Sequence, residues 1–341
     1  MATSTPKVSP FTSTVVAAMR KLQAPAHPRI QRSSQTVVLT IRDKVLLEAP
    51  YRPHLKNSAL LTIDLTKAVA DEAIERRDSI IVAYHPIIFR PLKSFTLANT
   101  QQNSLLRLAQ EGISVYCPHT AVDAAPGGLN DWLADIHIPI TANRFAKASP
   151  STRSIITPVK DAPEGFETAG YGRIVRFEQP EELSTIIRRI IRALHPDIEE
   201  KLSVAVPQSV PQGEKSQIKI SSIGICAGSG GSLLNGLDVD LLFTGELSHH
   251  EALAATEQGK CVITAFHSNT ERGFLRQRMK GVLMDAIDEY LTKEGHRQAE
   301  TSVDDWKEPD WNITVSGIDR DPYEIVHTDT FLSGTEGAGS W

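Results

Sequence analysis

Residues 261–271 read Cys261-Val262-Ile263-Thr264-Ala265-Phe266-His267-Ser268-Asn269-Thr270-Glu271, an apolar run that ends at a histidine and is followed by a carboxylate four residues later. The same pattern occurs earlier, where Ile113 to Tyr116 precedes Cys117-Pro118-His119-Thr120-Ala121-Val122-Asp123. A third run, Ile80 to Tyr84, ends in His85-Pro86. Short apolar runs that stop at polar residues predict buried strands. Three strand ends that each offer a histidine indicate a metal centre.

Composition places the chain among ordinary globular proteins. It has 341 residues, of which 40% are hydrophobic and 23% charged, with a formal charge of -5. This length suits one large or two ordinary domains. The acidic balance argues against a dedicated nucleic-acid binder, and no apolar run approaches the ~20 residues that span a bilayer. The three cysteines form no CxxC pair, which indicates buried thiols in a reducing, cytoplasmic setting.

Both ends of the chain differ from the rest in composition. Residues 1–42 contain no Asp or Glu but are rich in Ser, Thr and basic residues, which is the composition of a transit peptide. The alternative, which we favour, is a disordered lead-in followed by a helix from Thr14 to Leu22. A mitochondrial destination therefore stays open. Residues 327–341 are polar and glycine-rich, which predicts a flexible tail.

Strands and helices alternate along the chain, which predicts an α/β fold. Two similar halves are expected, with a metal site between them, because each half has a strand that ends in a histidine with a carboxylate four residues on. The expected division is a divergent or disordered segment 1–44, a first half 45–150, a connecting strand–helix region and loop 151–220, a second half 221–326 and the tail 327–341. Helices are expected over 67–77, 103–111, 180–194, 248–258 and 270 to about 293.

Four candidate metal ligands emerge together: His85, Asp123, His267 and Glu271. Two imidazoles and two carboxylates suit Zn, Fe, Mn or Ni better than Ca or a thiolate site. Each has an ordinary alternative. His267 and Glu271 also fit a solvated pair at a helix start, where an acidic side chain is favoured anyway, and a lone His85 is more often a structural residue.

Three further histidines are candidates for catalysis. His119 lies in the same loop as Asp123. His249 and His250 begin a helix after Glu246 and are ligands, partners that fix a ligand's tautomer, or a general base; the alternative is ordinary capping. Residues 227–232 read Ala-Gly-Ser-Gly-Gly-Ser. They lack the Walker lysine, which favours a tight, sterically forced turn over a phosphate cradle.

Seven segments in register resemble the GTP cyclohydrolase I type 2-like family, also called the NGG-interacting-factor-three family. They are 83–89 with Lys93, 119–130, 170–173, 226–232, 240–250, 267–271 and 319–322. The form Tyr84-His85-Pro86 is similar to the eukaryotic branch.

The resemblance implies a two-metal site inside a ring-shaped, hexameric homo-oligomer. It implies that His85, Asp123, His267 and Glu271 are the metal ligands and that His119 lines the site. Many members have histidine where this chain has Tyr84, and phenol, with a pKa near ~10, is a poorer ligand. Residues 27–45 also differ from the family pattern.

The leading hypothesis is a hydrolase in which one or two divalent metal ions activate water against a nucleotide or pterin-like substrate. His119, His249 or His250 would move protons. The rival hypothesis is a non-enzymatic interaction factor, linked to transcription or metal handling, that has protein partners. A ring that binds nucleic acid through its channel is the least favoured reading, and no membrane association is expected.

Overall fold

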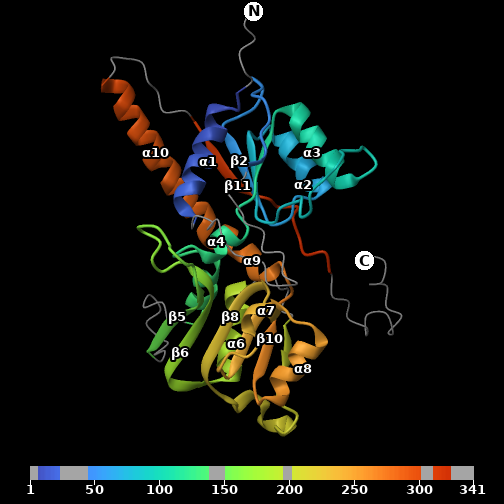
Figure 1. Ribbon diagram of the computed structural model, residues 1–341, viewed down its shortest axis with the longest axis vertical. Coiled ribbons are helices and arrows are strands. Elements are labelled where there is room, and N and C mark those ends of the chain that lie inside the picture. Colours follow the sequence, from blue (N-terminus) through green and yellow to red (C-terminus); the bar gives the residue numbers. More distant parts are fainter. Residues whose placement is uncertain (1–6, 24–44, 138–149, 195–201, 301–309, 324–341) are drawn as a thin grey trace, which may run out of the picture.

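The computed structural model describes residues 7–23, 45–137, 150–194, 202–300 and 310–323. The tail 327–341 and most of the predicted segment 1–44 lie outside these residues. Two lobes, each built on one sheet, are stacked along the long axis of the molecule (Figure 1). This arrangement confirms the predicted α/β class with two halves. Among the described residues, no helix is both long enough and apolar enough to cross a membrane.

The first sheet has the order β1-β4-β3-β2-β11. Its strands are β1 (Val45–Leu47), β4 (Ser114–Tyr116), β3 (Ile80–Ala83), β2 (Ser58–Thr62) and β11 (Asn312–Val315). All neighbours are parallel except β1 and β4. Strand β11 comes from the C-terminal part of the chain and pairs with β2. The predicted second half, 221–326, therefore contributes strands to both sheets, because β11 pairs with β2 in the first lobe.

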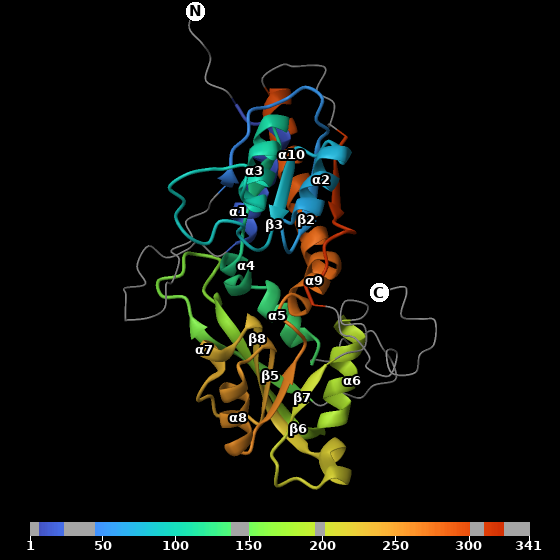
Figure 2. The same ribbon diagram turned by 90° about the vertical axis from the view of Figure 1, so that its right-hand side faces the viewer.

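Helices cover both faces of the first sheet (Figure 2). On one face, α2 (Lys67–Arg76) and α3 (Thr100–Glu111) pack over Leu60 and Ile81. On the other face, α1 (Pro10–Leu22) and α10 (Lys280–Glu300) pack over Leu61. Strand residues that alternate between two covered faces produce the uninterrupted apolar runs of the sequence.

The ends of the first-lobe helices follow ordinary capping chemistry. The cap of helix α3 is Asn99, four residues before the predicted cap at Asn103, because the Asn99 side chain accepts a hydrogen bond from the Gln102 amide at 3.0 Å. It ends at Gly112 in the left-handed conformation, as predicted. The predicted helix in the N-terminal segment is present as α1, capped by Ser9.

The second sheet has the order β5-β6-β8-β9-β10-β7. Its strands are β5 (Ser151–Pro158), β6 (Gly170–Glu182), β8 (Lys219–Ser229), β9 (Leu241–Glu246), β10 (Cys261–Thr264) and β7 (Ser203–Ala205). Strands β8, β9 and β10 are parallel, and the other pairs are antiparallel. The region 151–220, predicted as a connection, thus supplies β5, β6 and β7 to the sheet.

The second sheet is also covered on both faces. Helix α6 (Leu183–Leu194) packs on the side of Val175 and Phe243, and α8 (His249–Glu257), with the short α7 (Gly231–Leu234), packs on the other. Helix α6 starts after the predicted Pro180, because residues 181 and 182 still pair with β8.

Short helices join the two lobes. Helices α4 (Thr120–Ala124), α5 (Leu129–Asp135) and α9 (Asn269–Phe274) lie between the sheets (Figure 1). Helix α9 continues through one π-helical turn, Leu275–Met279, into α10, which packs against α1 in the first lobe. The long helix predicted from Thr270 to about residue 293 is therefore one continuous path with a π turn inside it.

His137, at the end of α5, is fully buried beside Phe243, with ring centroids 5.6 Å apart. Neither of its ring nitrogens has a hydrogen-bond partner among the described residues. Burial, with a further contribution from the charge of Arg189, lowers the pKa of His137 from 6.5 to about 3. The folded protein therefore keeps this imidazole neutral.

We expect His137→Phe to make the fold more resistant to acid. The unfolded chain takes up a proton near pH 6.5 while folded His137 does not, so the wild type loses stability as the pH falls from 6.5 toward 3, by up to about 1.4 kcal/mol per pH unit. Urea unfolding at pH 7.5 and pH 5 measures this loss. The exposed variant His250→Phe should keep the wild-type pH dependence; equal pH dependence of the wild type and His137→Phe would refute the assignment.

Candidate metal centre

The carboxyl ends of the parallel strands in both sheets meet at the boundary between the lobes. From the first sheet come Asp64 after β2, His85 after β3 and His119 after β4; from the second come Gly228 near the end of β8, Glu246 at the end of β9 and His267 after β10. The ends of parallel strands are where α/β sheets place their sites. Two facing sheets thus gather six strand ends around one point.

His85, His267 and Glu271 form a group able to hold a metal ion. One ligand atom from each lies within 4.8 Å of the others. The Glu271 carboxylate, whose side chain is 2% exposed, lies 3.4 Å from Nε2 of His85 and 3.6 Å from Nε2 of His267. Its Oε2 atom has no hydrogen-bond partner among the described residues. A buried carboxylate that lies between two imidazoles fits a divalent cation.

Each histidine is oriented by a carboxylate on its other nitrogen. Asp64 Oδ1 lies 3.0 Å from Nδ1 of His85, and Glu246 Oε1 lies 2.9 Å from Nδ1 of His267. Both Nε2 atoms therefore face Glu271, which is the usual arrangement of metal-binding histidines. Burial alone would lower the pKa of His85, but the contacts with Asp64 and Glu271 outweigh it and raise that pKa to about 10.

Arg272 holds the Asp64 carboxylate through an ion pair. Its guanidinium lies 3.3 Å from Asp64 and 2.8 Å from Asp319. Asp319 in turn accepts hydrogen bonds from the amides of Ile63 and Asp64. Sequence reasoning missed Asp64 and Arg272, although Asp64 directly follows an apolar run, as His85 does. The C-terminal segment is thus tied to the site by a buried ion pair.

Asp123 lies outside the three-residue group, against Tyr84. The Tyr84 hydroxyl donates to Asp123 Oδ1 at 2.6 Å. Burial, only partly offset by this hydrogen bond, raises the pKa of Asp123 to about 7, and burial raises the pKa of Tyr84 well above its usual value. The structure therefore brings together three of the four predicted ligands, and it pairs the fourth, Asp123, with the phenol of Tyr84.

His119 faces the same region as a neutral imidazole. Its ring lies 5.7 Å from that of His85, and its buried Nδ1 has no hydrogen-bond partner among the described residues. Burial, followed by the charges of His85 and His267, lowers the pKa of His119 to about 4. The backbone of His119 has a φ of 42°, and that of Phe266 a φ of 65°. Such conformations cost free energy and cluster at functional sites.

His249 and His250 are placed elsewhere. Both side chains are exposed at the start of α8, in contact with each other, with ring centroids 5.3 Å apart. The helix itself is closed by a capping box between Ser248 and Glu251. Neither histidine lines the cleft beside the metal-binding group. A catalytic role for this pair stays a prediction from sequence.

Gly228 makes room for the metal-binding group. Its φ is +60°, and a Cβ atom there would lie 2.9 Å from both His267 Nε2 and Glu271 Oε1. The Gly228 amide donates to Thr270 Oγ1 at 2.9 Å, which holds the turn against α9. The glycine-rich segment is thus a sterically forced turn around the site, as favoured from the sequence.

Gly228→Ala should lower the affinity for a divalent cation such as Zn²⁺ roughly 10- to 100-fold, because the new methyl group displaces His267 and Glu271. Competition with a chromogenic chelator measures this change. Gly236→Ala is the matched control, since Gly236 has a φ of +77° but nothing within 4 Å of its Cβ position. It carries the same backbone strain and should bind metal like the wild type. Equal affinities for the two variants would contradict the steric argument.

The fold and the site define an α/β protein whose two sheets face each other across a His/His/Glu group. The chain belongs to the Duf34/NIF3 (NGG1p interacting factor 3) family, whose profile matches residues 52–297. It is 43% identical over 280 residues to the NIF3 homolog of Schizosaccharomyces pombe, covering 82% of this chain and 88% of that one. It is 41% identical over 274 residues to NGG1-interacting factor 3 of Saccharomyces cerevisiae, covering 80% and 82%. The resemblance inferred from the seven segments is thereby confirmed.

Solved structures share the fold at low sequence identity. A Bacillus cereus protein related to NIF3 superposes with a TM-score of 0.61 at 17% identity, covering 92% of this chain and 98% of that one. Reduced HcgD from Methanocaldococcus jannaschii gives a TM-score of 0.51 at 20% identity, covering 67% and 79%. These likenesses support the two-sheet architecture described above.

Proposed function

We propose that this protein is a metal-dependent hydrolase that acts on a small heterocyclic molecule such as a nucleotide. The observation that carries the proposal is the buried Glu271 carboxylate, which lies between Nε2 of His85 and Nε2 of His267 and whose Oε2 makes no hydrogen bond among the described residues. This group opens on a cleft of about 1400 Å³ that both histidines line. A site for a cation beside a large cleft is the arrangement that metal-assisted hydrolysis needs.

Different residues of the chain have different proposed roles. His85, His267 and Glu271 would hold a Zn, Fe, Mn or Ni ion. Asp64 and Glu246 orient the two imidazole rings through their Nδ1 atoms. When bound, such an ion acts as a Lewis acid and lowers the pKa of water. We keep His119 as the proposed proton carrier, because its ring lies 5.7 Å from that of His85.

Asp123 is proposed as a second proton-holding group. Its pKa of about 7 lets it exchange a proton near neutral pH. We also keep Asp123 as the proposed fourth metal ligand, since its hydrogen bond with Tyr84 involves only Oδ1. We keep the predicted involvement of His249 and His250 as a weaker element of the proposal, since both lie exposed on α8.

His267→Ala should weaken both metal binding and turnover. It removes one of three ligands, so we expect at least a ~10-fold loss of metal affinity and a ~100-fold or larger loss of GTP turnover. Metal content by mass spectrometry and product formation by chromatography are the measurements. His54→Ala, an exposed histidine paired with Glu111, is the control. Metal-loaded wild type that is inert on nucleotides and pterins would overturn the hydrolase proposal.

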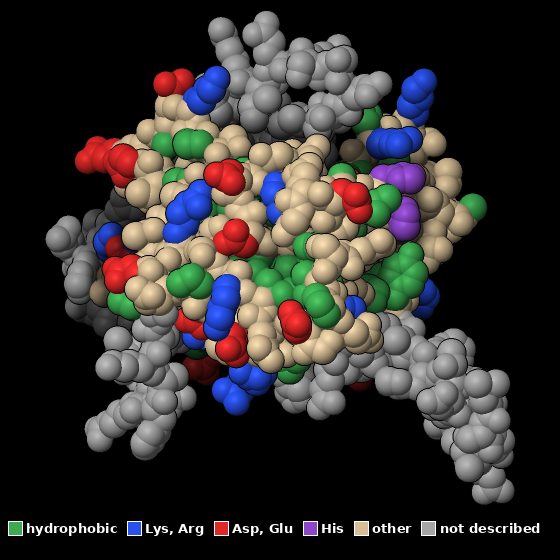
Figure 3. Space-filling view, turned by 90° about the horizontal axis from the view of Figure 1, so that it is seen from below, with side chains coloured by type: hydrophobic (Ala, Val, Ile, Leu, Met, Phe, Trp, Pro, Cys, Tyr) green, Lys and Arg blue, Asp and Glu red, His purple; other side chains and the backbone are tan. Residues whose placement is uncertain are grey.

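A metal-handling or interaction factor is the second candidate. A family relative carries the name NGG1-interacting factor 3, which supports protein partners. The two candidates differ in coordination, since an open ligand position favours catalysis and a closed one favours structure. Charges of both signs are interspersed on the described face of the second lobe (Figure 3), which gives no support to nucleic-acid binding there.

We also propose a homo-oligomer, of the hexameric size predicted from the family resemblance. Phe95 is 51% and Leu97 72% exposed, two residues apart in one segment. Large apolar side chains that gather on a surface mark contacts between proteins. We propose that a second copy of the chain packs against these two side chains.

Leu97→Asp should shift the protein to smaller species in sedimentation velocity, because a charge placed in an apolar contact is costly to bury. Leu253→Asp is the matched control, since Leu253 is 42% exposed on α8, away from this segment. It should sediment like the wild type. A wild type that sediments as a monomer at micromolar concentration would end the oligomer proposal.

A further inference from the structure

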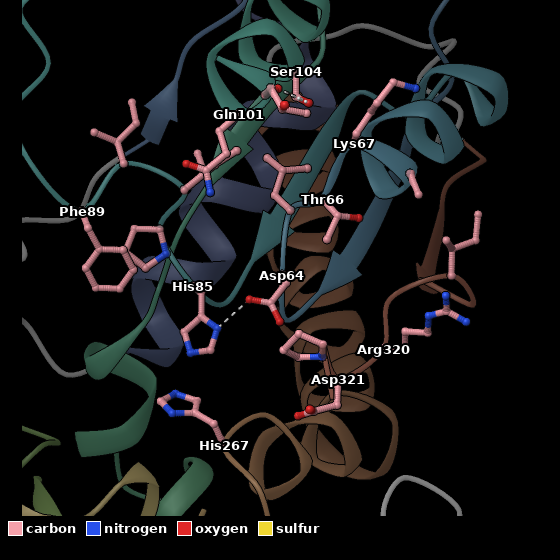
Figure 4. A pocket seen from close by; sticks show the side chains of 18 of the residues that line it. Asp64, Thr66, Lys67, His85, Phe89, Gln101, Ser104, His267, Arg320 and Asp321 are labelled. Atoms are coloured by element: carbon pink, nitrogen blue, oxygen red, sulfur yellow. Dashed lines mark hydrogen bonds and ion pairs between the residues drawn. The ribbon is translucent and has the colours of Figure 1, made fainter. Parts of the chain in front are cut away.

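The turn formed by Ala227 and Gly228, near the end of β8, lies directly against the metal-binding group. A Cβ atom at Gly228 would lie 2.9 Å from both His267 Nε2 and Glu271 Oε1, so the backbone itself touches these two ligands. The rings of His85 and His267 lie opposite each other at the site, with centroids 5.2 Å apart (Figure 4). A small displacement of the turn would therefore change the position of His267 and Glu271 relative to His85.

The turn departs from the regular hydrogen-bonding pattern of the sheet. The pairing of β8 with β9 is irregular between Cys226 and Ser229, and such irregularities re-aim the chain next to functional sites. Buried backbone groups that leave a strand ladder need other partners. Side chains from three other elements provide them here. They are Asn130, which accepts from the Ala227 amide at 3.0 Å, Thr270, which accepts from the Gly228 amide at 2.9 Å, and Thr244, which donates to the Gly228 carbonyl at 3.0 Å.

Asn130 joins this turn to the loop that follows the first sheet. It is the second residue of α5 and is 2% exposed. Its Oδ1 accepts from the Ala227 amide, and its Nδ2 donates to the Asp123 carbonyl oxygen at 3.2 Å. One planar amide thus links α4, which follows β4 of the first sheet, to the turn of the second sheet. Because one partner is a donor and the other an acceptor, the side chain at this position needs both functions.

Helix α5 is held in place on both sides of Asn130. On one side, Gly128 packs so closely against α4 that a Cβ atom there would lie 2.0 Å from the Val122 carbonyl oxygen. On the other side, Asp131 forms a buried ion pair with Arg173 of β6, at 2.6 Å. A side chain on a base that is fixed in this way determines the position of the backbone group that it contacts.

The simpler alternative is that Asn130 only stabilises the fold, since most buried polar side chains satisfy nearby backbone groups. Two contacts favour a more specific role. The amide that Asn130 holds belongs to the residue before Gly228, which touches two of the metal-binding side chains. Its second bond goes to Asp123, whose carboxylate accepts from Tyr84, the neighbour of His85.

We propose that Asn130 is a positioning residue for the metal-binding group. It keeps the turn at Gly228 against His267 and Glu271, and it ties that turn to the loop that carries Asp123. The parts of the site that come from the two sheets are thereby held in one geometry. This inference rests on the proposed function only for the presence of a cation, because it concerns the arrangement of the ligands and not the reaction.

Asn130→Ala should weaken the binding of Zn²⁺ by the full-length protein roughly 10-fold, because groups that orient metal ligands contribute at this level. Competition with a chromogenic chelator measures the affinity. The visible absorption of bound Co²⁺, which reports ligand geometry, should change as well. Ser222→Ala is the matched control, since Ser222 is also buried on β8 and accepts a hydrogen bond from a backbone amide, that of Asp240, at 3.1 Å. It lies earlier in the strand, so it should bind both ions like the wild type.

A double-variant cycle separates positioning from a general loss of stability. Thr270→Val frees the same turn through the Gly228 amide. Its effect on Zn²⁺ affinity, combined with that of Asn130→Ala, should therefore deviate ~2-fold or more from the product of the single effects. Asn130→Ala and Ser222→Ala should combine without such a deviation. Thermal melting identifies the folded variants. If Asn130→Ala does not fold, Asn130→Ser replaces it with a smaller expected loss, because a hydroxyl serves at most one of the two backbone groups.

The outcomes for this proposal and for the hydrolase are distinct. Wild-type Zn²⁺ affinity and an unchanged Co²⁺ spectrum in the folded Asn130 variant, or an equal loss of affinity in Ser222→Ala, would disprove the positioning role. A wild type that binds Zn²⁺ but turns over no nucleotide or pterin would remove the hydrolase and leave the positioning role standing. A wild type that binds no divalent cation would remove both.

Discussion

The burial of the Glu271 carboxylate is the constraint on which the arrangement of the two lobes depends. Moving an ionised carboxylate out of water costs several kcal/mol unless positive charge compensates it. The two imidazoles that flank this carboxylate come one from each sheet, His85 from the first and His267 from the second. The two sheets must therefore present the carboxyl ends of their parallel strands to each other. The path of α9 into α10, which carries Glu271 and then crosses to the first lobe, holds this geometry in place.

The backbone around the site adopts unfavourable conformations where the strands end. Gly228, His119 and Phe266 all have positive φ values, at the ends of three different strands. A glycine adopts this region without strain, but the other two residues do not. Their cost is met by the packed sheets on either side. Unfavourable conformations thus occur in the turns that carry His119 and His267 to the site.

Local signals in the sequence were enough to predict the strand ends and the class of fold. His85, His119 and His267 each follow an apolar run, so their placement needed only the periodicity of a buried strand. Contacts between segments far apart in the chain could not be predicted from local sequence patterns. The pairing of β11 with β2, and the Arg272–Asp319 ion pair that it permits, join residues far apart in the chain. The hydrogen bond between Tyr84 and Asp123 likewise depends on the packed structure, and the role of Asp123 as a ligand stays a prediction.

The two lobes contribute unequally to the site. The second sheet supplies His267, its orienting partner Glu246 and the turn at Gly228, all of which touch the metal-binding group. The first lobe supplies His85 together with most of the cleft. The segment after β11 links these roles, because Asp319 holds Arg272 while its neighbour Arg320 lines the cleft. One short stretch near the C-terminus thus stabilises the metal-binding geometry and also forms part of the cleft wall.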